Sequence, residues 1–335
     1  MTGLAGIRRR WFGISPEEAT FARRGFSAAE PAAQAHLETA GRAFIEGYNT
    51  ALATPQAAEL PAELNRVEST FRGFAFEGAA MALALLDLVT PWNRRRFDDF
   101  CRSPEGDGHY YLLFVGAGWA VARVPWARRR FERSLRRYHP LYRWLALDGY
   151  GFHEGFFYTT RLVAEQQLPP RLSDCARRVF DQGLGRSLWF SHGGDADRLA
   201  ATVARFPAAR REDLWSGIGL GAAYAGGVSR QQLGQLLEHA RRHATHLAQG
   251  ASFAAKARVR AGNPAPHTEL ACQVFCRTSA DEAAAVTDNC LENLPSNGAK
   301  PAYEVWRTRI REHFATATAT EPISTAARIG EPAHR

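Results

Sequence analysis

The pattern of hydrophobic and polar positions along this 335-residue chain predicts helices over most of its length. Apolar residues recur at intervals of three and four over residues 28–52, 161–183, 197–206 and 231–248, which places them on one face of a helix. Hardly any stretch alternates with a period of two, so a large sheet is not expected. Ser229 is expected to cap the start of the last of these helices, and Gly250 to end it.

Three related motifs of glycines and aromatic residues indicate an internal repeat. They are FRGFAFEGAAMALALLD from Phe71, LDGYGFHEGFFYTTRLV from Leu147 and WSGIGLGAAYAGG from Trp215. Comparison of the first two motifs matches Glu77 with Glu154. A second glycine-containing motif follows each of them, and the third copy is shortened. Small residues on helix faces let two backbones approach closely. The predicted fold is therefore all-α, an irregular helical repeat array of three diverged units with closely packed Gly/Ala/aromatic helices.

The chain is expected to divide into three parts. Residues 1–27 form a basic N-terminal segment, and residues 28–314 form the helical repeat domain. Residues 315–335 have a low-complexity composition that is typical of a disordered tail.

Composition narrows the class of protein. Hydrophobic residues make up 45% and charged residues 23%, as in globular proteins with a core. No apolar run approaches the roughly 20 residues of a membrane span, and the N-terminus lacks the pattern of a secretory signal, so the cytoplasm is the expected compartment. The net charge of +8 comes from arginines that are spread along the chain, and nucleic-acid binding is therefore not expected. Five cysteines at irregular spacing predict neither a disulfide framework nor a zinc site.

Two glycine motifs imitate cofactor-binding loops but lack the context that such loops need. The segment YYLLFVGAGWAV (110–121) looks like the start of a dinucleotide-binding fold, yet no second strand and no suitably placed acid follow it. The segment GIGLG (217–221) follows no buried strand. Close contacts between helices explain both sets of glycines better, and no cofactor is assigned.

The strongest polar pairs are His153 with Glu154, and His192 with Asp195, all within aromatic surroundings. Histidine is the usual general acid or base near neutral pH, and a carboxylate can orient it. The alternative is that these groups only form hydrogen bonds to neighbouring helix ends. The segment DGYGFHEGFF (148–157) is predicted to be a mostly buried helix whose Asp148, His153 and Glu154 face a pocket or a helix junction.

The site is predicted to lie between about residues 142 and 227, where apolar walls and convergent polar groups coincide. The four residues of the two pairs are the candidate catalytic residues. The candidate substrate-binding residues are Asp148, Tyr150, Phe152, Phe156, Trp189, Asp213 and Trp215.

Three histidines in the C-terminal half have a spacing that could bind a metal. His239, His243 and His246 would share one face of a helix, as metal-binding imidazoles can. Arg241 and Arg242 flank them, and no acidic ligand stands at a recognised spacing. A solvated basic face is the favoured interpretation, and no metal site is predicted.

Seven motifs distributed over residues 5 to 315 carry a resemblance to a known family: RRRWFGI, ARRGF, GFAFEGAAMALALLD, FVGAGWA, LDGYGFHEGFF, LWF…GGD and DLWSGIGLGAAYAGG. Together they resemble a domain-of-unknown-function family that is encoded in enediyne antibiotic gene clusters of high-GC bacteria, beside the iterative polyketide synthase. The resemblance implies an accessory role in making the enediyne core. It also implies a polyene or enediyne-precursor small molecule as partner, together with other proteins of the cluster, including a membrane protein.

Two classes of function fit this resemblance. One is an enzyme that acts on the polyene intermediate during core formation. The other is a non-catalytic scaffold or chaperone that shields the intermediate or docks partner proteins of the cluster. Surfaces lined by aromatic residues suit both, because polyenes bind through apolar contacts with few polar groups.

Overall fold

The computed structural model describes residues 3–56, 58–90, 92–124, 126, 133, 135–295 and 298–319. Every regular element in these residues is a helix, as the sequence predicts. In chain order the elements are α1 (Gly3–Phe12), η1 (Pro16–Ala19), α2 (Phe21–Arg24), α3 (Pro31–Ala53), α4 (Leu60–Leu64), α5 (Ser69–Val89), α6 (Arg96–Cys101), α7 (Pro104–Gly108), α8 (Tyr110–Arg123), α10 (Tyr142–Phe157), η3 (Thr160–Ala164), α11 (Asp174–Ser191), α12 (Ala196–Ala204), α13 (Ala208–Ala225), α14 (Arg230–His239), η4 (Arg241–His243), α15 (Ala244–Ala261), α16 (Pro266–Phe275), α17 (Ala280–Asn289) and α18 (Ala302–Ala319).

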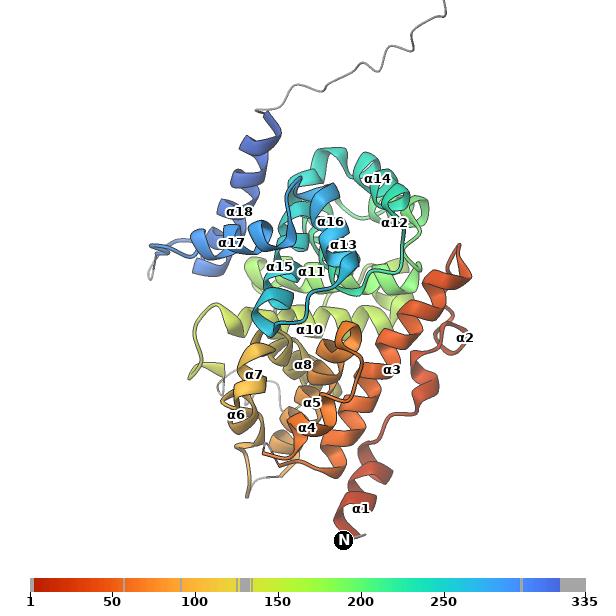
Figure 1. Cartoon of the computed structure of the whole chain (residues 1–335), viewed down its shortest axis with the longest axis vertical. Helices are drawn as coiled ribbons and strands as arrows, with labels where there is room; N and C mark the ends of the chain where they lie inside the picture. The colour runs from red at the N-terminus through yellow and green to blue at the C-terminus, as the bar shows by residue number, and fades with distance from the viewer. Residues whose placement is uncertain are drawn as a thin grey trace, which may run out of the picture.

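The long helices form one continuous layer in which each helix packs against the next, in the order α3, α5, α8, α10, α11, α13 and α15. Figure 1 shows α10 across the middle of the molecule, with α3, α5 and α8 below it and α11, α13 and α15 above it. The layer curls back on itself. His36 of α3 contacts the carbonyl oxygen of Ala225 at 2.7 Å, at the end of α13. Asn263, after α15, donates to the carbonyl oxygen of Ser69 at the start of α5 at 3.4 Å.

Pairs of glycines two residues apart set the distance between neighbouring helices of the layer. On α8, Gly116 faces the preceding helix α5 and Gly118 faces the following helix α10. A Cβ at either position would lie only 2.0 Å from a carbonyl oxygen, of Glu77 or of Ala146. Only a glycine hydrogen fits there, so the backbones lie closer than any side chain would allow. The same arrangement recurs on the next three helices, with Gly149 and Gly151, Gly183 and Gly185, and Gly217 and Gly219.

The regular unit of the fold is a single helix with its connection. The first glycine of each pair, including Gly250 of α15, recurs every 33 or 34 residues from Gly116 onward. The structure does not confirm the three larger units predicted from the sequence, because the packing glycines occur on every helix of the layer from α8 to α15. In this register Glu77 corresponds to Asp148, whereas the sequence comparison placed it opposite Glu154.

Several predicted helix limits differ from the structure. The stretch 161–183 begins in the π-helical turn η3, and α11 starts only at Asp174, beyond Pro169 and Pro170, because proline cannot continue a helix. The stretch 231–248 is two helices, α14 and α15, separated by η4. Ser229 does cap α14, through a capping box with Gln232. Gly250 ends no helix, because it lies within α15 against the backbone of α13.

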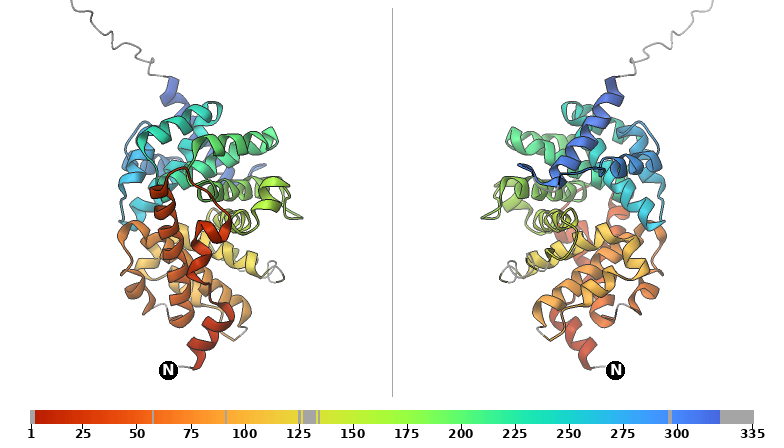
Figure 2. Two further views of the ribbon diagram at one scale, coloured as in Figure 1. Left: turned by 90° about the vertical axis from the view of Figure 1, so that its right-hand side faces the viewer. Right: turned by 90° about the vertical axis from the view of Figure 1, so that its left-hand side faces the viewer.

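The basic N-terminal segment packs along α3, and Figure 2 shows it lying against the rest of the molecule. Tyr48 donates to the carbonyl oxygen of Phe12 at 2.9 Å, and the backbone of Phe21 donates to Glu38 at 3.0 Å. At the other end, α18 extends to Ala319, so residues 315–319 of the predicted disordered tail are helical. Residues 320–335 lie outside the described residues. None of the described helices combines the length and the apolar character that crossing a membrane requires.

Candidate functional site

The residue before each packing glycine of this series, including Gly78 of α5 and Gly250 of α15, lies in the interior of the curled layer. At each of these positions except Gln249, the packing glycine of the next helix lies against the carbonyl group of the residue itself. The side chains of successive helices therefore lie close together in the core. All of these residues are buried, and all but Val115 are polar. They are Glu77, Val115, Asp148, Gln182, Ser216 and Gln249.

Four of these polar residues form a chain of hydrogen bonds across the interior. Gln182 donates to Asp148 Oδ2 at 2.9 Å. The Ser216 hydroxyl donates to Gln249 Oε1 at 2.8 Å and lies 3.2 Å from Gln182 Oε1. Arg307 of α18 donates to Gln249 Oε1 at 3.3 Å. Buried polar groups that lose a hydrogen-bond partner destabilise the folded state. The complete network therefore holds α10, α11, α13, α15 and α18 in one relative position.

Arg186 of α11 lies between two buried carboxylates. Its Nη2 is 2.8 Å from Asp148 Oδ1 and 3.9 Å from Glu77 Oε1. Glu77 has no exposed surface, and among the described residues no donor makes a well-formed hydrogen bond to its carboxylate. Burial raises the pKa of Glu77 to about 7, and the attraction of the Arg186 guanidinium and a weaker contribution from the nearby Trp119 indole oppose this only in part. Glu77 can therefore hold or release a proton near neutral pH.

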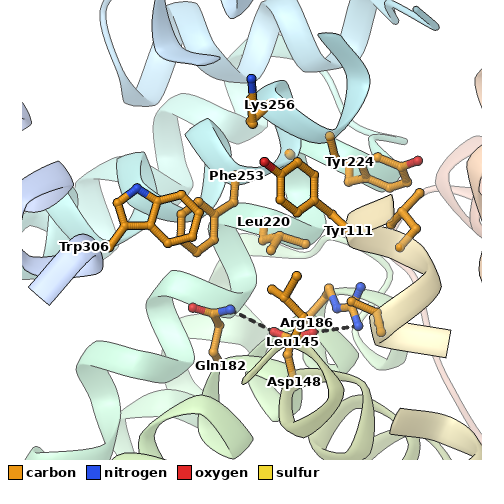
Figure 3. Close-up of a pocket in the computed structure, with 14 residues that line it drawn as sticks. Tyr111, Leu145, Asp148, Gln182, Arg186, Leu220, Tyr224, Phe253, Lys256 and Trp306 are labelled. Carbon is orange, nitrogen blue, oxygen red and sulfur yellow. Dashed lines mark hydrogen bonds and ion pairs between the residues drawn. The ribbon is translucent and has the colours of Figure 1, made fainter. Parts of the chain in front are cut away.

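Asp148, Gln182 and Arg186 close one end of a narrow cavity, here called the central cavity (Figure 3). Lys256 lies on the opposite side of the cavity in this view. The volume of the central cavity is about 40 Å³. The remaining walls are apolar or aromatic, and Figure 3 labels Tyr111, Leu145, Leu220, Tyr224, Phe253 and Trp306 among them.

A second cavity, the aromatic cavity, lies beyond Phe152. The Arg186 guanidinium carbon is 4.3 Å from the centre of the Phe152 ring, so the charged cluster separates the two cavities. Its volume is also about 40 Å³, and Ile14 and Ala19 of the N-terminal segment form one side. The aromatic residues of its wall are Phe44, Phe74, Trp119, Phe152, Phe156, Phe157 and Phe190.

His153 and Glu154 are buried beside the aromatic cavity, but neither of them lines either cavity. His153 Nδ1 lies 3.2 Å from Glu154 Oε1, and Arg161 forms an ion pair with the other carboxylate oxygen of Glu154. The Trp119 ring, 5.4 Å from the imidazole between ring centres, does line the cavity. Burial lowers the pKa of His153, although Glu154 opposes this. The pair ties α10 to the π-helical turn η3 at a helix junction.

His192 and Asp195 lie at the start of α12 and make contacts that hold this helix. The His192 ring bridges Ser191 Oγ at 2.9 Å and Thr202 Oγ1 at 2.8 Å. Burial lowers the pKa of His192 to about 4. Asp195 is the N-cap of α12 and accepts a hydrogen bond from the backbone of Arg198 at 3.0 Å. The structure brings neither residue into the central or the aromatic cavity.

Three of the candidate substrate-binding residues border a cavity. Asp148 lies at the end of the central cavity, and Phe152 and Phe156 form part of the aromatic cavity. Tyr150, which lies between them in the sequence, packs against Phe180 with ring centres 5.4 Å apart.

The other three candidates serve the core. The Trp189 indole donates to the carbonyl oxygen of Gly226 at 3.0 Å, and Trp215 is buried on α13. Asp213 accepts from Arg307 Nη2 at 2.6 Å and from Arg178 Nε at 3.0 Å. These contacts join helices, and none of the three residues lines either cavity.

Sequence reasoning missed Glu77, Gln182, Arg186 and Lys256 as site residues. A signal existed for Glu77 and Gln182, because each precedes a glycine of the series that packs the layer. Arg186 and Lys256 carry no comparable local signal. Arg186 meets Asp148, and Lys256 lines the opposite side of the same cavity, only because the helices of the layer pack in this order.

The three histidines considered for a metal do not stand on one helix. His239 ends α14 and pairs with Asp197 at 2.7 Å, while η4 separates it from His246 in α15. The rings of His243 and His246 are 5.9 Å apart between centres. In the part of the chain that the structure describes, no three His, Cys, Asp or Glu side chains are grouped so that they could hold a metal ion.

Comparison with known proteins places the chain in a family. The profile described as protein of unknown function (DUF1702) matches residues 3–314. The chain belongs to this family. The DUF1702 match includes every helix of the layer and both cavities. No curated protein and no solved structure matches the chain.

Proposed function

We propose that this DUF1702 protein binds an elongated, mainly apolar small molecule in its central cavity. The observation that carries the proposal is the cavity itself, whose apolar walls end on the buried pair of Asp148 and Arg186. Small-molecule sites usually combine such walls with a few convergent polar groups. The proposed setting is enediyne-type polyketide antibiotic biosynthesis, with the polyene intermediate as ligand. This setting rests on the resemblance of the sequence motifs to the enediyne-cluster family.

A whole polyene is larger than the cavity of about 40 Å³, so its binding requires the apolar walls to move apart, and a slender, flat and rigid chain requires the least movement. A rigid ligand loses little conformational freedom on binding, so more of the apolar contact contributes to affinity. Burial of its surface against residues such as Phe253 and Trp306 supplies roughly 25 cal/mol per Å². At the polar end, Arg186 Nε is buried and has no acceptor among the described residues, so an oxygen atom of the ligand could accept its hydrogen bond.

The lining of the central cavity favours binding over turnover. Its carboxylate, Asp148, is already held by Arg186 and Gln182. The described lining has no serine, cysteine or threonine beside a base, the arrangement that nucleophilic catalysis requires. The protein would then shield the polyene from water and from side reactions. Action on the polyene during core formation is the alternative, in which Glu77 would take up or release the proton.

Binding can be measured with trans-parinaric acid, a linear conjugated tetraene whose fluorescence rises in an apolar site. Leu220 lines the central cavity and is half-buried, so Leu220→Trp would fill cavity space. We expect this variant to weaken tetraene binding by about tenfold or more, because the extra ring overlaps the ligand. Leu237→Trp on α14 is the matched control, since Leu237 is equally half-buried but lies outside the cavity, and it should bind like the wild type.

Two outcomes separate the alternatives. Recovery of unchanged tetraene or cluster polyene after incubation, as judged by chromatography, supports shielding, and a new product supports the enzyme. Equal tetraene affinity in Leu220→Trp, Leu237→Trp and the wild type would refute the central cavity as the site. Thermal denaturation of both variants checks that they are folded.

A further inference from the structure

Large apolar side chains are exposed at one end of the molecule. On α1, Ile7 is 54% and Trp11 is 77% exposed, and because they are four residues apart they share one face of the helix. Trp92, in the connection between α5 and α6, is 81% exposed. Figures 1 and 2 both show α1 and this connection at the lower end of the molecule.

Arginines accompany these apolar side chains. Arg10 precedes Trp11 on α1 and Arg94 follows Trp92, and both are exposed. Among the described residues no carboxylate lies within ion-pair distance of either guanidinium. The basic–aromatic patch is defined here as Ile7, Arg10, Trp11, Trp92 and Arg94.

A neighbouring pair of arginines shows that the two segments of the patch lie close together. Burial, and then the like charge of Arg96, lower the pKa of Arg8, so α1 and the start of α6 are near enough for their charges to repel. Arg96 is held by Asp87 at 3.1 Å.

The opposite face of α1 lies beside acidic residues and is not part of the patch. Arg9 there borders a groove that carries Glu46, Glu59 and Glu63. The acids are thus collected on one side of α1, while the apolar residues with Arg10 are on the other. This division is typical of a helix that lies on a lipid surface, where arginines reach the headgroups and Trp and Ile enter the boundary of the acyl chains.

We propose that the basic–aromatic patch binds the surface of an anionic lipid bilayer. The aliphatic Ile7 beside two exposed tryptophans distinguishes this partner from a nucleic acid, whose contacts would use arginines and stacked rings along a groove. Phosphatidylserine or a similar anionic lipid supplies the charge that Arg10 and Arg94 lack among the described residues. The patch lies apart from both cavities, so this inference does not depend on the proposed ligand.

Co-sedimentation with vesicles tests the proposal. Full-length protein should bind vesicles of phosphatidylcholine containing phosphatidylserine at physiological ionic strength, and should bind vesicles of phosphatidylcholine alone at least about tenfold more weakly. The double variant Trp11→Ala/Trp92→Ala should lose at least about tenfold of this binding. Trp126→Ala is the matched control, because Trp126 is also exposed (75%) but lies outside the patch, and it should bind like the wild type.

Because all three tryptophans are exposed, their replacement should leave the circular dichroism melt unchanged, which separates a loss of binding from a loss of fold. Equal binding of the double variant and the wild type would overturn the proposal. So would equal binding to the two kinds of vesicle. Binding of a labelled DNA or RNA duplex that the double variant loses, without any binding to anionic vesicles, would replace the bilayer with a nucleic acid as the partner.

Discussion

The buried charge of Glu77 can be tested by replacing the residue with glutamine. Burial raises the pKa of this carboxyl from 4.5 to about 7. Because the pKa is raised in the folded state, the protonated residue contributes stability that is fully present below about pH 4.5. This contribution is lost as the pH rises through 7. A difference of this size between the folded and unfolded pKa corresponds to about 3 kcal/mol in the free energy of unfolding.

Glu77→Gln is neutral at every pH and therefore lacks this pH dependence. Relative to the wild type, we expect the free energy of unfolding of the variant to increase by about 2–3 kcal/mol between pH 5 and pH 8.5. Urea denaturation followed by circular dichroism at both pH values measures the change. Glu105→Gln, which removes an exposed acid, should change stability by at most about 0.5 kcal/mol at either pH.

The result that would refute this reasoning is a difference between Glu77→Gln and the wild type that is the same at both pH values. Glu77 would then not carry a desolvated charge above neutral pH. A variant that is less stable than the wild type at pH 8.5 but not at pH 5 would also refute it. In that case the attraction between Glu77 and Arg186 would exceed the cost of burying the carboxylate.

Further predictions concern packing, a buried ion pair and a helix cap, and denaturant unfolding measures all of them. Gly183→Ala would place a Cβ 1.9 Å from the carbonyl oxygen of Asp148, so α10 and α11 must separate. We expect a loss of about 3 kcal/mol or more. The control Gly234→Ala meets nothing within 4 Å and should gain about 0.5–1 kcal/mol; equal effects at the two glycines would contradict the packing role. Arg307→Met removes one of the two guanidinium partners of buried Asp213, the other being Arg178, and should cost about 2–3 kcal/mol, whereas wild-type stability would show that this ion pair is dispensable. Ser229→Ala removes the capping box of α14 and should cost about 1 kcal/mol, and no loss would mean that the cap is replaced by water.

The sequence by itself determined that the fold is all-helical and that glycines such as Gly116 and Gly118 allow close packing of helices. Helical periodicity and the scarcity of alternating stretches predicted an all-helical chain, which the described residues confirm. The glycines of YYLLFVGAGWAV were assigned to close helix contacts, and Gly116 and Gly118 make such contacts. The sequence also predicted Ser229 as the N-cap of a helix, and it caps α14. These features are local, because each depends on residues within one or two helical turns.

Only the tertiary structure decided which polar residues meet. Asp148 was among the predicted binding residues, but its partner Arg186 lies on another helix and has no signal of its own. The sequence comparison paired Glu77 with Glu154, while the contacts between helices place Glu77 in register with Asp148. The two alignments differ by six residues, and at about 100° per residue Asp148 and Glu154 point about 120° apart around α10, one to the central cavity and the other to a helix junction. The pattern of a single helix shows that a position is buried, but the packing of neighbouring helices determines what it is buried against.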